Sequence, residues 1–122
     1  MSDETDPQAQ RRRGLEKMEE VYGWEFQDGP GDFLAYTADH LFADIWSRPG
    51  LTIEQRRLVL IGLLAAQGAD DVLGIQLGAA HRRGELDADA LRELTIFLAH
   101  YAGWPVGAKV NTIVESTLAE DR

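Results

Sequence analysis

The stretch TIEQRRLVLIGLLAAQG, residues 52–68, decides the fold class of this sequence. Thr52 opens a T-x-x-Q pattern, the form of a capping box, in which two side chains satisfy free backbone amides at the start of a helix. The segment Leu58–Ala66 is apolar on all sides, which is typical of a helix buried on every face, and Gly68 is a helix stop. The stretch therefore predicts a buried helix over Ile53–Gln67.

Amphipathic helices are predicted on both sides of this stretch, because apolar residues recur there with a helical period. They are Gln10–Tyr22, Phe33–Trp46, Ala69–Arg83, Ala88–Ala102 and Val106–Ala119. No segment alternates apolar and polar residues as a strand would. The sequence thus predicts an all-α fold, a compact bundle of about six helices. The polar residues 1–9 are expected to form a flexible acidic tail, and residues 10–122 a single helical domain.

Composition excludes several functions. The net charge of -9 disfavours nucleic acids and anionic membranes as partners. The chain has no cysteine, so it forms no disulfide, thiolate nucleophile or thiolate metal site, and its 3 histidines are too scattered to predict a metal site. The polar start MSDETDPQAQRRR resembles no signal peptide, and no apolar run is long enough for a membrane span. A cytoplasmic protein is expected.

Self-association is also expected. A helix that is apolar all round needs cover on every side, and the other helices of so short a chain do not readily supply it. A second copy of the chain would provide the missing cover. Composition does not fix the number of subunits.

Three segments together resemble the γ-carboxymuconolactone decarboxylase family, part of the alkylhydroperoxidase D-like superfamily. They are DHLFADIWSRPGL, then RRLVLIGLLAAQG leading to GAAHRRGELDADALREL, then LAHYAGWP. The resemblance covers roughly residues 13–118. It implies an alkylhydroperoxidase D-like helical fold, trimers or hexamers, and cofactor-free lyase or isomerase chemistry. The implied substrate is a small carboxylated or carbonyl compound of the kind met in aromatic-compound degradation.

The departures from the superfamily also bear on function. The superfamily's peroxide reductases carry a glutamate, two cysteines and a histidine at positions that align with Arg57, Ala69, Val72 and Gln76. Without a thiolate, thiol-dependent peroxide reduction is excluded for this chain alone. The decarboxylases usually keep the histidine that Gln76 replaces, and Phe97 stands where histidine or glutamine is common. Two functions therefore stay open: a carboxy-lyase, or a catalytically silent oligomer that binds a small ligand or only assembles.

Decarboxylation sets clear requirements for a site. Loss of carbon dioxide beside a conjugated carbonyl leaves an oxyanion, so the site must hold a carboxylate, stabilise that oxyanion and return a proton. Arginine, histidine and hydrogen-bond donors suit these tasks. The candidates are His40, His100 and Tyr101 as catalytic residues, and Arg48, Trp46 and Gln76 as substrate-binding residues. His40 and Arg48 match positions used by some decarboxylases, and no cofactor or metal is implied.

Structural alternatives exist for the candidates near residue 50. Arg48 precedes Pro49, so it can simply follow a helix end and pair with Asp44. His40 can be a partly buried structural histidine, and Trp46 a core or interface aromatic.

The candidates further along the chain have alternatives as well. His100 and Tyr101 are neighbours, so they point about 100° apart on a helix, and at most one faces a given pocket. Gln76 can bond to a neighbouring helix instead of a ligand.

Overall fold

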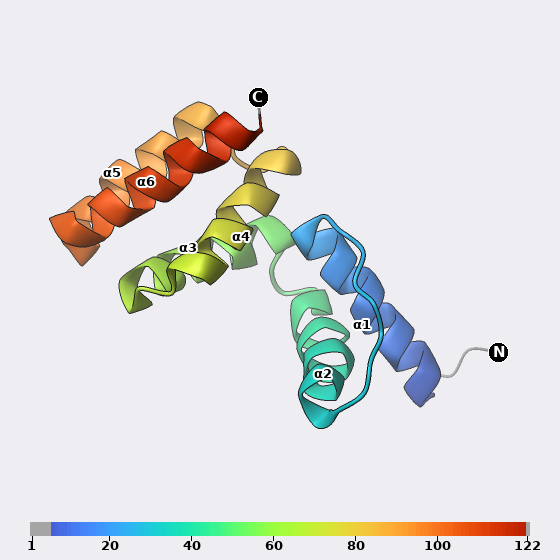
Figure 1. The fold of residues 1–122 in the computed structure, drawn as a ribbon. Helices are drawn as coiled ribbons and strands as arrows, with labels where there is room; N and C mark the ends of the chain where they lie inside the picture. Colours follow the sequence, from blue (N-terminus) through green and yellow to red (C-terminus); the bar gives the residue numbers. More distant parts are fainter. Residues whose placement is uncertain (1–5, 122) are drawn as a thin grey trace. The chain divides into compact units, whose positions relative to one another are not determined.

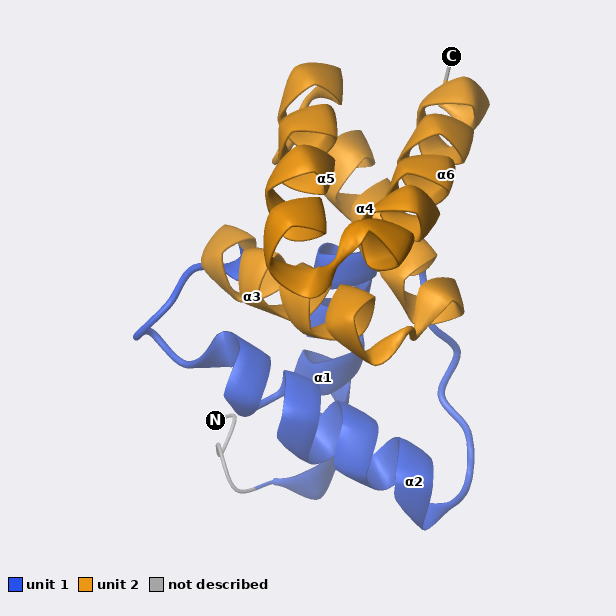
Figure 2. Cartoon of the chain, turned by 90° about the vertical axis from the view of Figure 1, so that its left-hand side faces the viewer, with its two compact units in different colours: residues 1–53 blue, residues 54–122 orange. Residues whose placement is uncertain are grey.

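The computed structural model describes residues 6–121, which contain helices and no strand (Figure 1). This confirms the predicted all-α fold. The chain divides into two compact units, Met1–Ile53 (unit 1) and Glu54–Arg122 (unit 2), as Figure 2 shows. A single domain over residues 10–122 stays a prediction. Each helix within the described residues is too short or too polar to span a bilayer.

Unit 1 begins with α1, Pro7–Tyr22, which starts three residues before its predicted start. The Asp6 side chain accepts a hydrogen bond from the Gln8 amide at 3.1 Å, and Pro7 fits the first turn of a helix. Residues 7–9 of the expected tail are therefore helical. Residues 1–5 of that tail lie outside the described residues.

The helix predicted over 33–46 is wrong in its continuity. It consists of α2 (Asp32–Ala35), the π-helix η1 (Tyr36–Phe42) and the short 3-10 helix η2 (Ile45–Ser47). The Ala43 amide donates to the Ala38 carbonyl, five residues back, at 3.0 Å. The periodicity of the sequence does not reveal such a widened turn.

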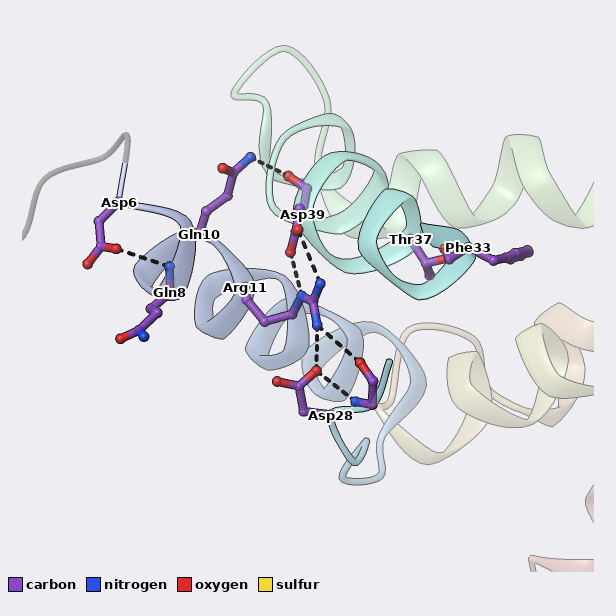
Figure 3. Close-up of polar contacts among 9 residues, drawn as sticks. Asp6, Gln8, Gln10, Arg11, Asp28, Phe33, Thr37 and Asp39 are labelled. Carbon is purple, nitrogen blue, oxygen red and sulfur yellow. Dashed lines mark hydrogen bonds and ion pairs between the residues drawn. The ribbon is translucent and has the colours of Figure 1, made fainter. Parts of the chain in front are cut away.

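Close packing of α1 on η1 accompanies this widened turn. A Cβ added to Gly14 would lie 1.8 Å from the Ala38 carbonyl oxygen, so only glycine fits there. Figure 3 shows the polar contacts beside this crossing. The Arg11 guanidinium lies 2.6 Å from an Asp39 carboxylate oxygen and 2.5 Å from one of Asp28, and Gln10 donates to the Asp39 carbonyl at 2.6 Å. These bonds tie α1, η1 and the loop between them together.

Unit 2 contains α3 (Ile53–Gln67, whose first residue belongs to unit 1), α4 (Asp70–Arg82), α5 (Ala88–Ala102) and α6 (Trp104–Glu120). Its apolar core draws on all four helices: Ile61, Leu64, Ala65, Leu73, Leu77, Leu91, Val110, Val114 and Leu118. The helices α5 and α6 lie side by side (Figures 1 and 2). A Cβ on Gly107 would lie 2.4 Å from the Ala99 Cβ, so this glycine sets their close approach.

Within one chain the helix over 53–67 is buried on one side only, and burial of its other side by a second copy of the chain stays a prediction. Ile61, Leu64 and Ala65 are buried, whereas Leu58, Leu63 and Val59 are exposed, Val59 to 68%. An apolar sequence makes burial favourable, but burial also requires a surface to pack against. In this structure one side of α3 therefore stays uncovered.

Candidate functional site

In unit 1, His40 and Arg48 lie on either side of Asp44. The distance from His40 Nδ1 to Asp44 Oδ2 is 3.9 Å, and that from Arg48 Nη1 to Asp44 Oδ1 is also 3.9 Å. The His40 and Arg48 side chains are 63% and 65% exposed. His40 belongs to the π-helix η1, a type of turn that is frequent at functional sites. Arg48 thus pairs with Asp44, as expected if Arg48 has a structural role.

Trp46 lies in the interior of unit 1. It is buried, and its ring lies almost parallel to that of Phe42 with centroids 5.8 Å apart. Phe42 in turn contacts Tyr22 at the end of α1. These contacts agree with a role for Trp46 in the core of unit 1, and none of them supports stacking of Trp46 on a substrate.

His100 and Tyr101 lie on the exposed side of α5. The His100 Nδ1 lies 2.7 Å from the Ile96 carbonyl oxygen. A carbonyl only accepts, so Nδ1 carries the proton in this contact, and Nε2 is the ring nitrogen that can exchange a proton with a ligand. The Tyr101 ring is next to that of Phe97, with centroids 5.1 Å apart, and Tyr101 is 83% exposed. His100 is therefore the better placed of the two for proton transfer.

A hollow of about 270 Å³ opens beside His100, between α5 and α6. Its lining comprises Thr95, Ile96, Ala99, Trp104, Gly107, Ala108 and Asn111. The Trp104 ring meets the His100 ring edge-on at 6.0 Å. The lining carries no cation, so nothing in it balances the charge of a carboxylate.

A second hollow, of about 440 Å³, lies on unit 1. Its charged lining residues are Arg11, Arg12, Glu16, Glu19, Glu25 and Asp28. Carboxylates outnumber cations there, and Arg11 is already paired with Asp28 and Asp39. Electrostatic repulsion therefore disfavours an anionic ligand in this hollow.

The strongest polar feature of unit 2 is a set of side chains around Arg57, called the Arg57 cluster, which comprises Arg57, Gln76, Arg83 and Glu85. Arg57 Nε and Nη2 donate to the two oxygens of Glu85 at 2.8 and 2.9 Å. Arg57 Nη1 donates to Gln76 Oε1 at 2.7 Å, and Arg83 Nη1 donates to Glu85 Oε2 at 2.5 Å. The Arg57 and Glu85 side chains are 0% and 4% exposed.

Local structure explains how these groups meet. Arg57 lies on the buried face of α3, one turn before Ile61 and two turns before Leu64. Gln76 lies next to Leu77 on the buried face of α4. Gly84, with φ +76°, ends that helix, and the Glu85 amide then donates back to the Ala80 carbonyl at 2.9 Å. This turn brings Glu85 to the Arg57 guanidinium.

One atom of the cluster has unmet hydrogen-bonding capacity. Arg57 can only donate, so its bond identifies the bonded Gln76 atom as the oxygen and fixes the orientation of the amide. Gln76 Nε2 is buried and has no hydrogen-bond partner among residues 6–121. Leaving a buried donor unpaired costs about 1–3 kcal/mol. The Arg57 cluster therefore presents an N–H group that an acceptor oxygen would satisfy.

Of these residues, only Gln76 is among the sequence-predicted site residues. Arg57 could have been recognised, because it shares the apolar face of α3 with Ile61 and Leu64, and a buried cation requires a partner. Nothing local marks Glu85 as that partner, since 28 positions separate the two residues. Within residues 6–121, no group of three or more His, Cys, Asp or Glu side chains is arranged to hold a metal ion.

Comparison with known proteins places these residues in a family context. A model of the carboxymuconolactone decarboxylase family matches residues 31–115. The chain is 34% identical over 102 residues to a 4-carboxymuconolactone decarboxylase of Acinetobacter baylyi, covering 77% of this chain and 75% of that protein. It is 27% identical over 130 residues to a nitrosuccinic acid decarboxylase of Metarhizium robertsii, covering 96% of this chain and 89% of that protein. The matched region includes the Arg57 cluster, His40, Arg48 and His100.

Proposed function

This chain belongs to the carboxymuconolactone decarboxylase family, and we propose that it catalyses a cofactor-free, decarboxylase-type reaction on a small carboxylic acid. The names of both relatives specify a carboxylic acid and its decarboxylation. The observation that carries the proposal on this chain is the buried, unpaired Nε2 of Gln76.

The chemistry of the step explains why that amide matters. When the bond to the leaving carbon dioxide breaks, its electron pair moves into a neighbouring electron-withdrawing group and produces an oxyanion. A fixed N–H donor in a buried setting lowers the energy of that oxyanion. Arg57 donates to the oxygen of the same amide, which polarises the amide and strengthens Nε2 as a donor. Gln76 is thus assigned to oxyanion stabilisation.

The proton that replaces carbon dioxide requires a different group, because an amide does not titrate near neutrality. His40 and His100 are assigned as candidate proton donors, with Tyr101 as a weaker one. Arg48 is assigned to a carboxylate of the substrate, since arginine binds carboxylates through charge-assisted hydrogen bonds and this side chain is 65% exposed.

Activity is tested by incubating the purified protein with 4-carboxymuconolactone and with nitrosuccinic acid, and by measuring released carbon dioxide. The proposal expects release above the rate in buffer and in heat-denatured protein for at least one small carboxylic acid. Absence of release from a panel of such acids, by a protein that is shown to be folded, would count against it.

A silent, oligomeric ligand-binding or assembly protein is the second candidate. One observation favours it, the Glu85 carboxylate that already occupies Arg57. The family resemblance adds that Gln76 stands where the decarboxylases usually have histidine. A folded protein that binds small carboxylates but never releases carbon dioxide would fit this function.

Self-association is proposed under either function, with the chain's partner being a second copy of itself. The support is the number of large apolar side chains exposed on unit 2: Leu58, Val59, Leu63, Ile96, Phe97, Tyr101 and Trp104. Large apolar side chains that are exposed in one chain are the ones that an interface between copies would cover. Trimers or hexamers are the assemblies that the family resemblance implies.

A further inference from the structure

The Glu85 carboxylate meets the Arg57 guanidinium as a substrate carboxylate would. Two parallel N–H···O bonds of 2.8 and 2.9 Å join the groups, which is the bidentate geometry that arginine offers to carboxylates. The pair is buried, so the surrounding water does not screen it. Glu85 therefore neutralises Arg57 inside the protein and takes the position in which an external carboxylate would bind most strongly.

Gln76 provides a second, independent observation at the same place. Its oxygen accepts from Arg57, whereas its nitrogen is buried and unpaired within the described residues. Both cations of the cluster, Arg57 and Arg83, thus bond to Glu85 within the chain, while the neutral donor Gln76 Nε2 lacks an acceptor. An oxygen bound to that donor would gain a hydrogen bond without gaining a salt bridge.

We propose that Glu85 is a specificity-determining residue, which neutralises Arg57 so that Gln76 binds one carboxylate or oxyanion oxygen through a neutral hydrogen bond. The assignment of a carboxylic acid as ligand rests on the proposed function. An internal carboxylate of this kind weakens binding of the ground-state carboxylate. It leaves the Gln76 N–H available for charge that develops later on oxygen, which favours the transition state over the substrate.

Glu85→Gln separates charge from shape, because glutamine keeps the length of the side chain and an oxygen that accepts from Arg57. The variant removes the negative charge of Glu85 from the Arg57 guanidinium, so an external carboxylate should bind more tightly. We expect affinity for acetate to rise by about tenfold or more over wild type, where tenfold equals 1.4 kcal/mol. Glu115→Gln is the matched control, since Glu115 forms a bidentate pair with Arg92 at 3.0 and 3.0 Å on the surface.

The readout is the side-chain amide resonance of Gln76 in ¹⁵N-labelled protein, identified by its loss in Gln76→Met. Sodium acetate is titrated at constant ionic strength into wild type, Glu85→Gln, Glu115→Gln and the double variant Glu85→Gln/Gln76→Met. Because the double variant has no Gln76 resonance, thermal stabilisation by acetate is measured for it and for Glu85→Gln. The proposal expects the Gln76 resonance to shift weakly in wild type and Glu115→Gln, and at lower acetate concentration in Glu85→Gln. It also expects acetate to stabilise the double variant less than it stabilises Glu85→Gln, because the hydrogen bond from Gln76 is then missing.

Three results would overturn the proposal. One is equal affinity for acetate in Glu85→Gln and wild type. Another is a Gln76 resonance that acetate does not move in wild type, which decides the matter even if Glu85→Gln fails to fold. The third is stabilisation by acetate that is as large in the double variant as in Glu85→Gln, since acetate would then merely replace a structural carboxylate at Arg57. Acetate binding involves no turnover, so a lack of decarboxylase activity leaves this test intact.

Discussion

Arg57 on α3 and Glu85 after α4 form a bidentate ion pair in the interior, with N–O distances of 2.8 and 2.9 Å and side chains that are 0% and 4% exposed. Removing charges from water costs free energy, which a buried pair offsets only with good geometry and further hydrogen bonds. Here Arg57 also donates to Gln76, and Glu85 also accepts from Arg83. The pair therefore holds a polar site in place in the interior of unit 2.

Glu85→Ala should destabilise the protein by about 3–5 kcal/mol, because it leaves a buried guanidinium without its counter-ion. Glu115→Ala, which breaks the exposed pair with Arg92, should cost at most about 1 kcal/mol. The free energy of unfolding from urea titration measures both. Equal losses in the two variants would show that burial gives the Arg57 pair no special importance.

Gly14→Ala should destabilise the protein by about 1–3 kcal/mol, the usual cost of forcing extra volume into a packed contact. The added Cβ would lie 1.8 Å from the Ala38 carbonyl oxygen, so α1 and η1 must separate. At Gly50 a Cβ meets nothing within 4 Å, so Gly50→Ala is the control and should leave the melting temperature nearly unchanged. A fully stable Gly14→Ala protein would contradict the close crossing.

The melting temperature of Asp28→Asn should approach that of wild type as the pH falls. Hydrogen bonds from Arg11 and from the Gly29 amide lower the pKa of the Asp28 carboxyl below its ordinary value of 3.8. This lowered pKa means that ionised Asp28 stabilises the folded protein. The stabilisation is complete when the pH is above the ordinary pKa, and it is lost as the pH falls through the lower pKa of the folded state. The wild type should therefore exceed Asp28→Asn in melting temperature by a constant margin above about pH 5, and the margin should narrow below pH 3.8. A margin that stays constant to low pH would contradict the Arg11 contact.

Light scattering at micromolar concentration should give a mass several times 13.6 kDa. Val59→Glu should lower that mass, because it places a charge on the uncovered apolar side of α3. Gln67→Glu adds the same charge at an exposed position on the same helix and should leave the assembly intact. A wild-type monomer that is stable and folded would refute the proposed self-association.

Much of the fold could be predicted from the sequence, since local signals determine it. The helices over 53–67 and 88–102 begin and end where periodicity and the Asp87 cap predict, and the Asp87 side chain accepts from the Ala90 amide at 2.8 Å. The change from α-helical to π-helical turns after Ala35 is not determined locally. It accompanies the contact of Gly14 with Ala38, which lies 24 positions further along the chain, so no window of residues 33–46 contains it.

The sequence predicts the family of this chain better than it predicts the candidate site. Three segments of the sequence resemble the carboxymuconolactone decarboxylase family, and the model of that family matches residues 31–115. The sequence predicts Gln76 as a site residue but not its neighbours Arg57 and Glu85. The pairing of Arg57 with Glu85 depends on how α3 and the end of α4 meet. Roles for His40, Arg48, His100 and Tyr101 stay predictions.

The measurement that tests the central claim most directly is carbon dioxide release by Gln76→Met, with kcat and KM determined separately on whichever acid the wild type decarboxylates. Methionine keeps the approximate volume of glutamine and removes the N–H donor. Gln67→Met, on the exposed end of α3, is the control. The account predicts that kcat falls by about 10²–10³, the effect of losing an oxyanion donor, with KM little changed and the control unaffected. A Gln76→Met enzyme with wild-type kcat would contradict the account.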